Sequence, residues 1–187
     1  MKRLMNSKAV LAIGAVLWMA AVCRGQVPEM AQPTKEHKLL DQFAGEWDTK
    51  AETIPAPGQE AIKCEGTESA KMIGGFWLVS HGNGSMMGMP VGSVLTIGYD
   101  PAKKKYVGTF LCSMDSTLWK YEGSMDESGK KLTLETEGPS PMDPKKIAKF
   151  REILELKDKD HKAFTSFMQD ENGKWVEIVA MKYERKK

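Results

Sequence analysis

Residues 45–52 read Gly-Glu-Trp-Asp-Thr-Lys-Ala-Glu, in which charged and uncharged side chains alternate without a break. Successive side chains of a β-strand point to opposite faces. The pattern therefore predicts a strand with Trp47, Thr49 and Ala51 facing inward and its charged residues facing water. Comparable short segments, separated by turn signals, fill almost all of the chain as far as Arg185. The sequence thus predicts an all-β fold that starts at Gly45.

Ten strand-like segments follow one another with no long helix between them. Short connections force neighbouring strands to run antiparallel, and Asn172-Gly173 is the strongest hairpin signal among them. Ten strands leave two exposed sheet edges unless the sheet closes, so we predict an up-and-down β-barrel. A two-sheet sandwich is the rival, but only residues 82–92, an expected Gly- and Met-rich loop, and 138–144 are long enough to cross between sheets. The expected strands are 45–52, 62–72, 76–81, 94–99, 105–113, 117–125, 131–137, 150–156, 163–169 and 175–184.

The N-terminus has the pattern of a secretory signal peptide. Three basic residues precede an uncharged apolar run of 14 residues, 9–22, which is shorter than the roughly 20 residues of a membrane-spanning helix. Cleavage after Cys23 or Gly25 is favoured over lipidation of Cys23, because Val22 is a poor neighbour for a lipidated cysteine. We therefore predict a periplasmic or secreted protein with no membrane span after cleavage.

A short helix is expected between the signal peptide and the barrel. Thr34 is a suitable N-cap, and Leu39, Leu40 and Phe43 share one face at helical spacing, so the helix can plug one end of a barrel. His37 falls on the polar side and is expected to be solvated. The predicted organisation is a signal peptide at 1–25, a leader with the plug helix at 26–44 and a barrel domain at 45–187.

Charge and cysteine content exclude some functions. The whole chain has 27 basic and 25 acidic residues, but residues 1–25 contain four basic residues and no acidic one, so the mature chain carries about −2. Nucleic-acid binding needs a clustered positive face and is not expected. Cys64 and Cys112 remain after cleavage. They fall on strands that are not neighbours in a meander, so two free thiols are expected rather than a disulfide.

Several motifs span nearly the whole mature chain: Leu40-x-x-Phe43-x-Gly45-x-Trp47, Gly74-Gly75-Phe76-Trp77, Met87-Gly88-x-Pro90, Gly98-Tyr99-Asp100-x-x-x-Lys104-x-Tyr106 and Tyr183-x-Arg185. Together these motifs resemble the bacterial family of unknown function called DUF1579. More distantly the chain is similar to calycin-type barrels, namely lipocalins, fatty-acid-binding proteins and nitrobindins.

The resemblance implies an eight- or ten-stranded cup with an internal ligand cavity. Lipocalins pair the tryptophan of a Gly-x-Trp motif with an arginine from a late strand, and the matching positions here are Trp47 and Arg185. We interpret this pair as a structural clasp at the closed end, where a guanidinium stacked on an indole contributes about 0.5–2 kcal/mol. Nitrobindins would imply a haem-binding histidine on a late strand. Residues 163–185 contain no histidine, so no haem or other cofactor is expected.

Candidate ligand contacts come from strand parity. The predicted lumen is lined by aromatic and thioether side chains, with a methionine-rich loop at its mouth and His81 beside that loop. Two acids, Glu68 and Glu177, share the inward parity of their strands, so each is a candidate polar anchor or half of an acid/base pair. The predicted ligand-binding set is Trp77, His81, Met86, Met87, Phe110, Trp119, Tyr121 and Met181.

No catalytic, metal or phosphate-binding motif stands out in the sequence. We therefore predict a non-enzymatic exported barrel that binds a small, largely apolar ligand. Two alternatives stay open: an enzyme that uses lumen carboxylates or His81, and a structural barrel whose core is filled by Phe110, Trp119, Tyr121 and Trp175. The sequence leaves the oligomeric state open.

The signal peptide gives a direct prediction. The exported protein is expected to begin near Arg24 or Gln26 and to be released as a soluble chain, which N-terminal sequencing and intact mass will show. A chain that still begins at Met1, or a lipid on Cys23, would contradict this prediction.

Overall fold

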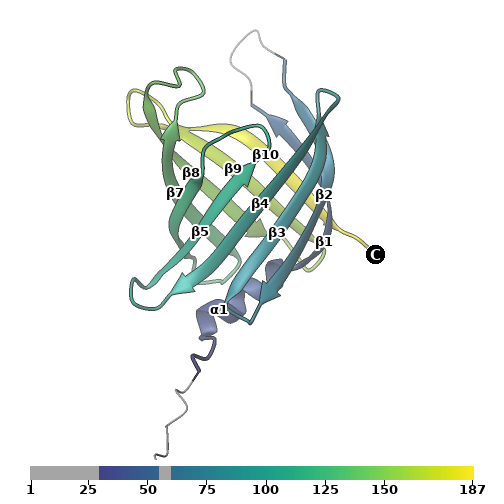
Figure 1. Ribbon diagram of the computed structural model, residues 1–187, viewed down its shortest axis with the longest axis vertical. Coiled ribbons are helices and arrows are strands. Elements are labelled where there is room, and N and C mark those ends of the chain that lie inside the picture. Colours follow the sequence, from purple (N-terminus) through teal and green to yellow (C-terminus); the bar gives the residue numbers. More distant parts are fainter. Residues whose placement is uncertain (1–29, 55–59) are drawn as a thin grey trace, which may run out of the picture. The chain divides into compact units, whose positions relative to one another are not determined.

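The computed structural model describes residues 30–54 and 60–187, and the predicted signal peptide lies outside these residues. Residues 32–187 belong to one compact unit. Its ten strands form a closed antiparallel barrel in the order β1-β10-β9-β8-β7-β6-β5-β4-β3-β2, so each strand pairs with its neighbours in sequence and the last strand pairs with the first (Figure 1). The predicted all-β, up-and-down barrel is confirmed.

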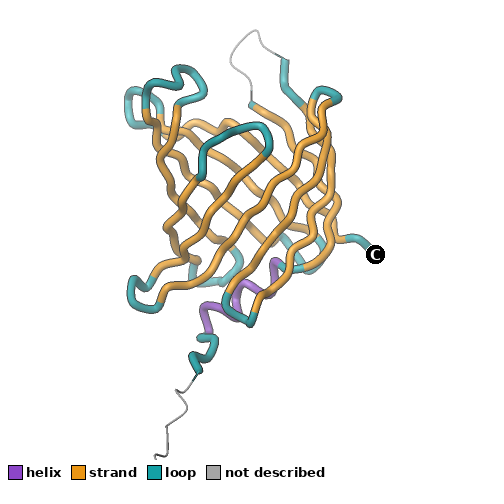
Figure 2. Tube along the Cα trace, viewed as in Figure 1, coloured by secondary structure: helices purple, strands orange, loops and turns teal. Residues whose placement is uncertain are grey.

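Most of the strands are longer than the sequence pattern suggested, whereas β5 and β6 are shorter. Figure 2 shows how short the turns between most strands are. Their inward side chains are buried or half-buried and alternate with more exposed outward ones, as a closed sheet requires. The bounds are β1 Gly45–Thr53, β2 Lys63–Ile73, β3 Trp77–Met86, β4 Met89–Asp100, β5 Lys105–Cys112, β6 Trp119–Met125, β7 Lys131–Pro139, β8 Ile147–Leu156, β9 His161–Gln169 and β10 Trp175–Arg185.

The expected loop at residues 82–92 is instead a hairpin. β3 and β4 pair without interruption from Trp77↔Gly98 to Met86↔Met89, and the chain turns at Met87 and Gly88 with φ of 52° and 79°. Glycine runs suggest a loop when only the sequence is read. A strand nevertheless accepts glycine where another backbone approaches closely. A Cβ on Gly84 would lie 2.8 Å from the carbonyl oxygen of Glu65 on β2, so a side chain there would collide with the neighbouring strand.

A short helix closes one end of the barrel, as predicted. α1 (Lys35–Leu40) continues into the 3₁₀ turn η1 (Asp41–Phe43), and the side chains of Leu40 and Phe43 are fully buried. Tyr106 Oη donates a hydrogen bond of 3.0 Å to the carbonyl oxygen of Glu36, which ties the helix to β5.

His37 is buried rather than solvated. Its Nδ1 accepts a hydrogen bond of 3.0 Å from the backbone N–H of Thr34, and its ring meets Phe76 and Tyr99 edge-on. The helical wheel placed His37 on the polar side of α1, but the hairpin turn before β3 and the end of β4 cover that side as well.

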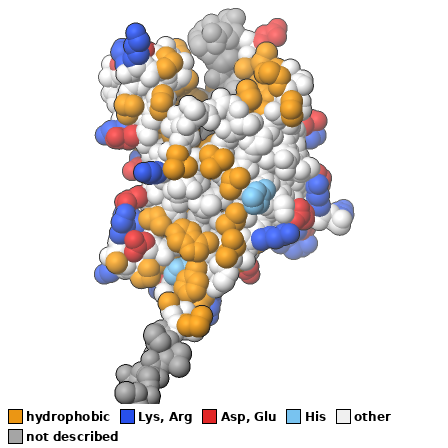
Figure 3. Space-filling model, viewed as in Figure 1, with side chains coloured by type: hydrophobic (Ala, Val, Ile, Leu, Met, Phe, Trp, Pro, Cys, Tyr) orange, Lys and Arg blue, Asp and Glu red, His pale blue; other side chains and the backbone are white. Residues whose placement is uncertain are grey.

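The other end of the barrel, which we call the mouth, is ringed by turns. Figure 3 shows hydrophobic side chains gathered at this rim and a band of them continuing down the outer face. Fully buried core residues such as Leu78, Ile97 and Leu132 lie toward the closed end, whereas inward residues nearer the mouth are half-buried. Cys64 and Cys112 are free thiols. Among the described residues, no helix is long and apolar enough to span a membrane.

Candidate functional site

The lumen has one wall of small side chains. Gly66 on β2, Ser80, Gly82 and Gly84 on β3, and Ser93 on β4 alternate with outward residues and share the inward face with Leu78 and Ile97. Side chains this small occupy little of the interior.

A second wall, on β5 to β8, carries large apolar side chains. Phe110 on β5 pairs with Trp119 on β6, and the Trp119 ring meets Phe150 on β8 edge-on with centroids 5.1 Å apart. A Cβ on Gly138 would collide with the Trp119 ring, so glycine at that position makes room for the indole. Phe110, Trp119 and Met181 face the lumen but are only half-buried. Because the sheet itself covers their outer side, their exposed surface opens into the lumen.

A polar group lies within this apolar wall. Glu152 on β8 is 8% exposed, and its Oε1 accepts a hydrogen bond of 3.1 Å from Ser166 Oγ on β9. Its other oxygen, Oε2, is buried without a partner, as is Thr136 Oγ1 on β7. Buried polar atoms are nearly always hydrogen-bonded, so two orphans on neighbouring strands mark this position as unusual.

Burial changes the acidity of the group. Desolvation raises the pKa of Glu152 from 4.5 to about 7, and the hydrogen bond from Ser166 offsets only part of that rise. Desolvation and the nearby charge of Glu152 raise the pKa of Tyr121, whose hydroxyl stays neutral. At neutral pH the lumen therefore presents a carboxyl group close to half-ionised, beside neutral hydroxyls.

A second cluster lies at the closed end, where β1 meets β10. The Arg185 guanidinium stacks over Trp47 at 4.0 Å from the ring centroid, and its Nη1 donates to the carbonyl oxygen of Ala44 at 2.9 Å. Gly45 has a φ of 135°, and a Cβ there would collide with Nη1 of Arg185. The glycine of the Gly-x-Trp motif thus leaves space for the arginine that covers the tryptophan.

Lys162 on β9 is the other cation that contacts the Trp47 ring. Its Nζ contacts Glu68 Oε1 at 2.5 Å and donates to the carbonyl oxygen of Phe43 at 3.3 Å. The same ammonium lies 4.4 Å from the Trp47 ring centroid and 4.6 Å from that of Tyr183. Burial lowers the pKa of Lys162 and Glu68 opposes that shift. The pair joins β2, β9 and the plug.

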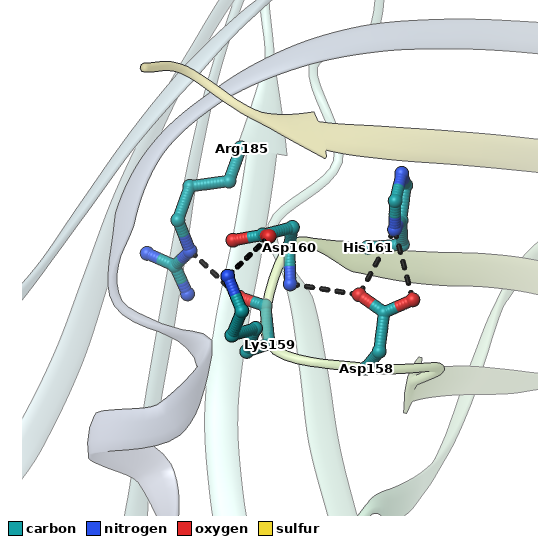
Figure 4. A network of polar contacts seen from close by, with 5 residues as sticks. All are labelled: Asp158, Lys159, Asp160, His161 and Arg185. Carbon is teal, nitrogen blue, oxygen red and sulfur yellow. Dashed lines mark hydrogen bonds and ion pairs between the residues drawn. The ribbon is translucent and has the colours of Figure 1, made fainter.

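The turn between β8 and β9 holds Arg185 from outside (Figure 4). Arg185 Nε donates to the carbonyl oxygen of Lys159 at 2.8 Å, and His161 Nδ1 lies 2.9 Å from Asp158 Oδ1. His161 is exposed, and its contact with Asp158 shapes the turn that carries Lys159.

Some predicted ligand contacts face the lumen and others do not. Phe110, Trp119, Tyr121 and Met181 face inward, and Met86 does so near the mouth; Met87 is at the exposed tip of the β3–β4 turn. Trp77 and His81 lie on the outer face, because buried Leu78 and Ser80 take the inward parity of β3. The prediction of lumen contacts was wrong for these two. The Trp77 ring lies over Gly98 on the outside of β4.

Of the two predicted lumen acids, Glu68 faces inward and Glu177 does not. Glu177 pairs with Phe167, whereas Val179 pairs with lumen-facing Ser166, and the register shifts between Glu177 and Val179. This bulge inverts the parity of β10, which a strict two-residue period could not reveal. Trp175 is outside for the same reason, stacked under the guanidinium of Arg151, and does not fill the core.

Sequence reasoning missed Glu152, Ser166, Thr136 and Lys162. A usable pattern was present, because Glu152 alternates in step with Phe150, Leu154 and Leu156. An acid on the apolar side of a strand is the signature of a buried carboxyl group. Within residues 30–54 and 60–187, no group of three metal-ligating side chains comes together.

Comparisons with known proteins agree with this architecture. A family model described as "Protein of unknown function (DUF1579)" matches residues 32–185, which confirms the resemblance found in the sequence. The S-type phycobiliprotein lyase CPES from Guillardia theta is 14% identical with a TM-score of 0.52, covering 81% of this chain and 96% of its own. Rv2717c from M. tuberculosis is 12% identical with a TM-score of 0.60, covering 83% and 100%. Likeness at this identity shows the fold alone. Comparison with curated proteins found no match.

The closed-end cluster predicts a large loss of stability on truncation. Trp47→Ala is expected to lower the free energy of unfolding by about 3–5 kcal/mol, because a fully buried indole leaves a cavity. Arg185→Ala should cost about 1–3 kcal/mol through the lost stacking and hydrogen bonds. Urea melts measure both. Trp175→Ala is the matched control, since its stack with Arg151 lies on the outer face, and it should cost clearly less. Equal losses for Trp47→Ala and Trp175→Ala would contradict a special role for the clasp.

Glu152 predicts a pH-dependent stability. Its pKa is raised in the folded state, so the folded protein binds more protons than the unfolded chain and becomes less stable as pH rises from about 4.5 to 7. The shift corresponds to about 3 kcal/mol at 1.36 kcal/mol per pH unit. Glu152→Gln should therefore raise the free energy of unfolding at pH 8 by about 2–3 kcal/mol and change it little at pH 4. Glu177→Gln, on the outer face, should show no such pH dependence.

Proposed function

We propose that this chain, which belongs to the DUF1579 family of proteins of unknown function, binds a small, largely apolar ligand in its barrel lumen. One observation carries the proposal. Phe110, Trp119 and Met181 face the interior of a closed barrel yet remain half-buried, and the glycines and serines of β2 to β4 occupy little of the same interior. Apolar surface that is kept accessible inside a barrel gains free energy when an apolar molecule covers it.

The arrangement of the charged groups favours binding over catalysis. Lys162 is engaged by Glu68 and the Phe43 carbonyl, and Arg185 by two backbone carbonyls and the Trp47 ring. Both cations therefore hold the closed end together instead of facing a substrate. A rigid closed end with accessible side chains farther up the lumen supports ligand binding. The family is one of unknown function and assigns no activity that would favour catalysis.

The proposed setting is outside the cytoplasm, in the periplasm or the surrounding medium. The support is the basic, apolar and small-residue pattern of residues 1–25. Free Cys64 and Cys112 are compatible with this setting because both lie on the lumen side of strands that do not pair with each other, which keeps the thiols apart.

Uptake of a neutral apolar dye tests the proposal. The purified protein is expected to bind Nile red with a fluorescence increase and a shift of emission to shorter wavelength. Ser93→Trp puts an indole on the small-residue wall and should weaken binding at least tenfold. Val94→Trp adds the same side chain one residue later, on the outer face of β4, and should leave the affinity within about twofold.

His81→Ala separates the container from a cofactor-dependent protein. His81 lies on the outer face, so its loss should leave Nile red binding unchanged. If Val94→Trp abolished dye binding and Ser93→Trp did not, the dye would bind to the outside of the barrel. That result would contradict binding in the lumen. Failure of the wild-type protein to take up any dye would favour the filled, structural barrel.

A further inference from the structure

We propose that the lumen selects a ligand with a protonated amine, which forms an ion pair and hydrogen bond with Glu152 while its apolar part lies between the two walls. This inference rests on the proposed function and names the chemical class of the ligand. The geometry that points to it is a carboxylate with one oriented and one unpartnered oxygen, placed at the inner surface of an otherwise apolar wall.

The carboxylate is held but not saturated. Ser166 fixes Oε1, and Oε2 is buried without a partner, so one oxygen positions the group and the other is left to accept a hydrogen bond. The final torsion of a glutamate side chain has broad, soft minima, so a small rotation can turn Oε2 toward the lumen. Thr136 Oγ1 is a second unpartnered acceptor. Thr136 pairs with Phe150, which makes it a diagonal neighbour of Glu152, roughly 7–8 Å away between Cα atoms.

The charged groups in the lumen determine which sign of charge on a ligand is favoured. Among the described residues, the lumen-facing carboxyl, ammonium and guanidinium groups other than Glu152 are those of Glu68, Lys162 and Arg185 at the closed end. Glu68 and Lys162 neutralise each other, and Arg185 is bound by carbonyls and stacked on Trp47. An anionic ligand would meet no free cation and would face Glu152. A cationic one would meet the single carboxylate that lacks a counter-charge.

The surroundings of Glu152 also favour a cation. The Trp119 ring meets Phe150, which is two residues from Glu152 on the same face of β8. The antiparallel register of β6 and β7 places lumen-facing Tyr121 opposite Thr136. Aromatic faces attract ammonium groups, most strongly away from water. The Tyr121 hydroxyl makes no hydrogen bond with another described residue and is available to the same ligand. An amine with an apolar tail fits both parts of this site.

A matched series of head groups on one alkyl chain tests the inference. Dodecylamine, dodecanol and dodecanoate are each used to displace Nile red from the full mature protein at pH 8. Dodecylamine is expected to compete at a concentration at least tenfold lower than either of the others. Glu152→Gln should remove that advantage, with each competition judged against the Nile red affinity measured for the same variant. Glu177→Gln, an acid-to-amide change on the outer face, should keep it.

The wild-type pH dependence gives a second test that needs no variant. Protonation of Glu152 removes the counter-charge, so dodecylamine should compete about tenfold less well at pH 5.5 than at pH 8, whereas dodecanol should change little. The alkylamine itself stays protonated over this range. This measurement keeps the inference testable if Glu152→Gln does not fold.

The outcomes separate the two proposals. Nile red binding with equal competition by all three compounds would overturn the amine preference and leave lumen binding intact. Stronger competition by dodecanoate, or an amine preference that survives in folded Glu152→Gln, would also overturn it. A wild-type protein that binds neither Nile red nor any of the three compounds would refute lumen binding and the amine preference together.

Discussion

The buried ammonium of Lys162 is the contact on which the closed end depends. It reaches from β9 to Glu68 on β2 and to the backbone of the plug, and it lies against the faces of Trp47 and Tyr183 on the two strands that close the barrel. Removing both charges from water is costly. The short contact to Glu68 and the two aromatic faces offset that cost only while all members are present. Taking away one partner would leave a buried charge and cost about 3–5 kcal/mol. The cluster therefore fixes geometry as much as it adds stability.

This fixed end allows the other end to be loosely filled. Leu40, Phe43 and Trp47 are fully buried and pack the bottom of the barrel, whereas Phe110 and Met181 higher up retain contact with solvent. A small domain can leave part of its interior unfilled only if the remaining core supplies the stability. The buried carboxyl of Glu152 adds to that burden, because desolvation of its charged form works against folding at neutral pH. Retaining such a group inside a barrel is easier to understand as a binding feature than as a structural one.

Much of the fold could be predicted from the sequence because inward and outward side chains alternate every residue along a strand. Trp47, Thr49 and Ala51 could be assigned to the inside with no knowledge of the partners, and the short connections then fixed the antiparallel order. The predictions failed where the period failed. The bulge after Glu177 inverted β10, and the inward direction of β3 had to be decided by Leu78 and Ser80, because Trp77 and Val79 are apolar on the other face. The glycines of residues 82–92 suggested a loop, since a close contact such as that of Gly84 with β2 cannot be seen in one segment.

The candidate site was harder to predict because it depends on contacts between side chains of different strands. Glu152 has an inward pattern in its own sequence, but that it lacks a full set of partners follows only from what β7 and β9 place beside it. Lys162 shows the opposite case. Its inward position looks equally exceptional along the strand, yet Glu68, more than ninety residues earlier, neutralises it. Two buried charges with the same local pattern thus have different roles. The neutralised one belongs to the scaffold, and the one that lacks a counter-charge is where a ligand gains most by supplying it.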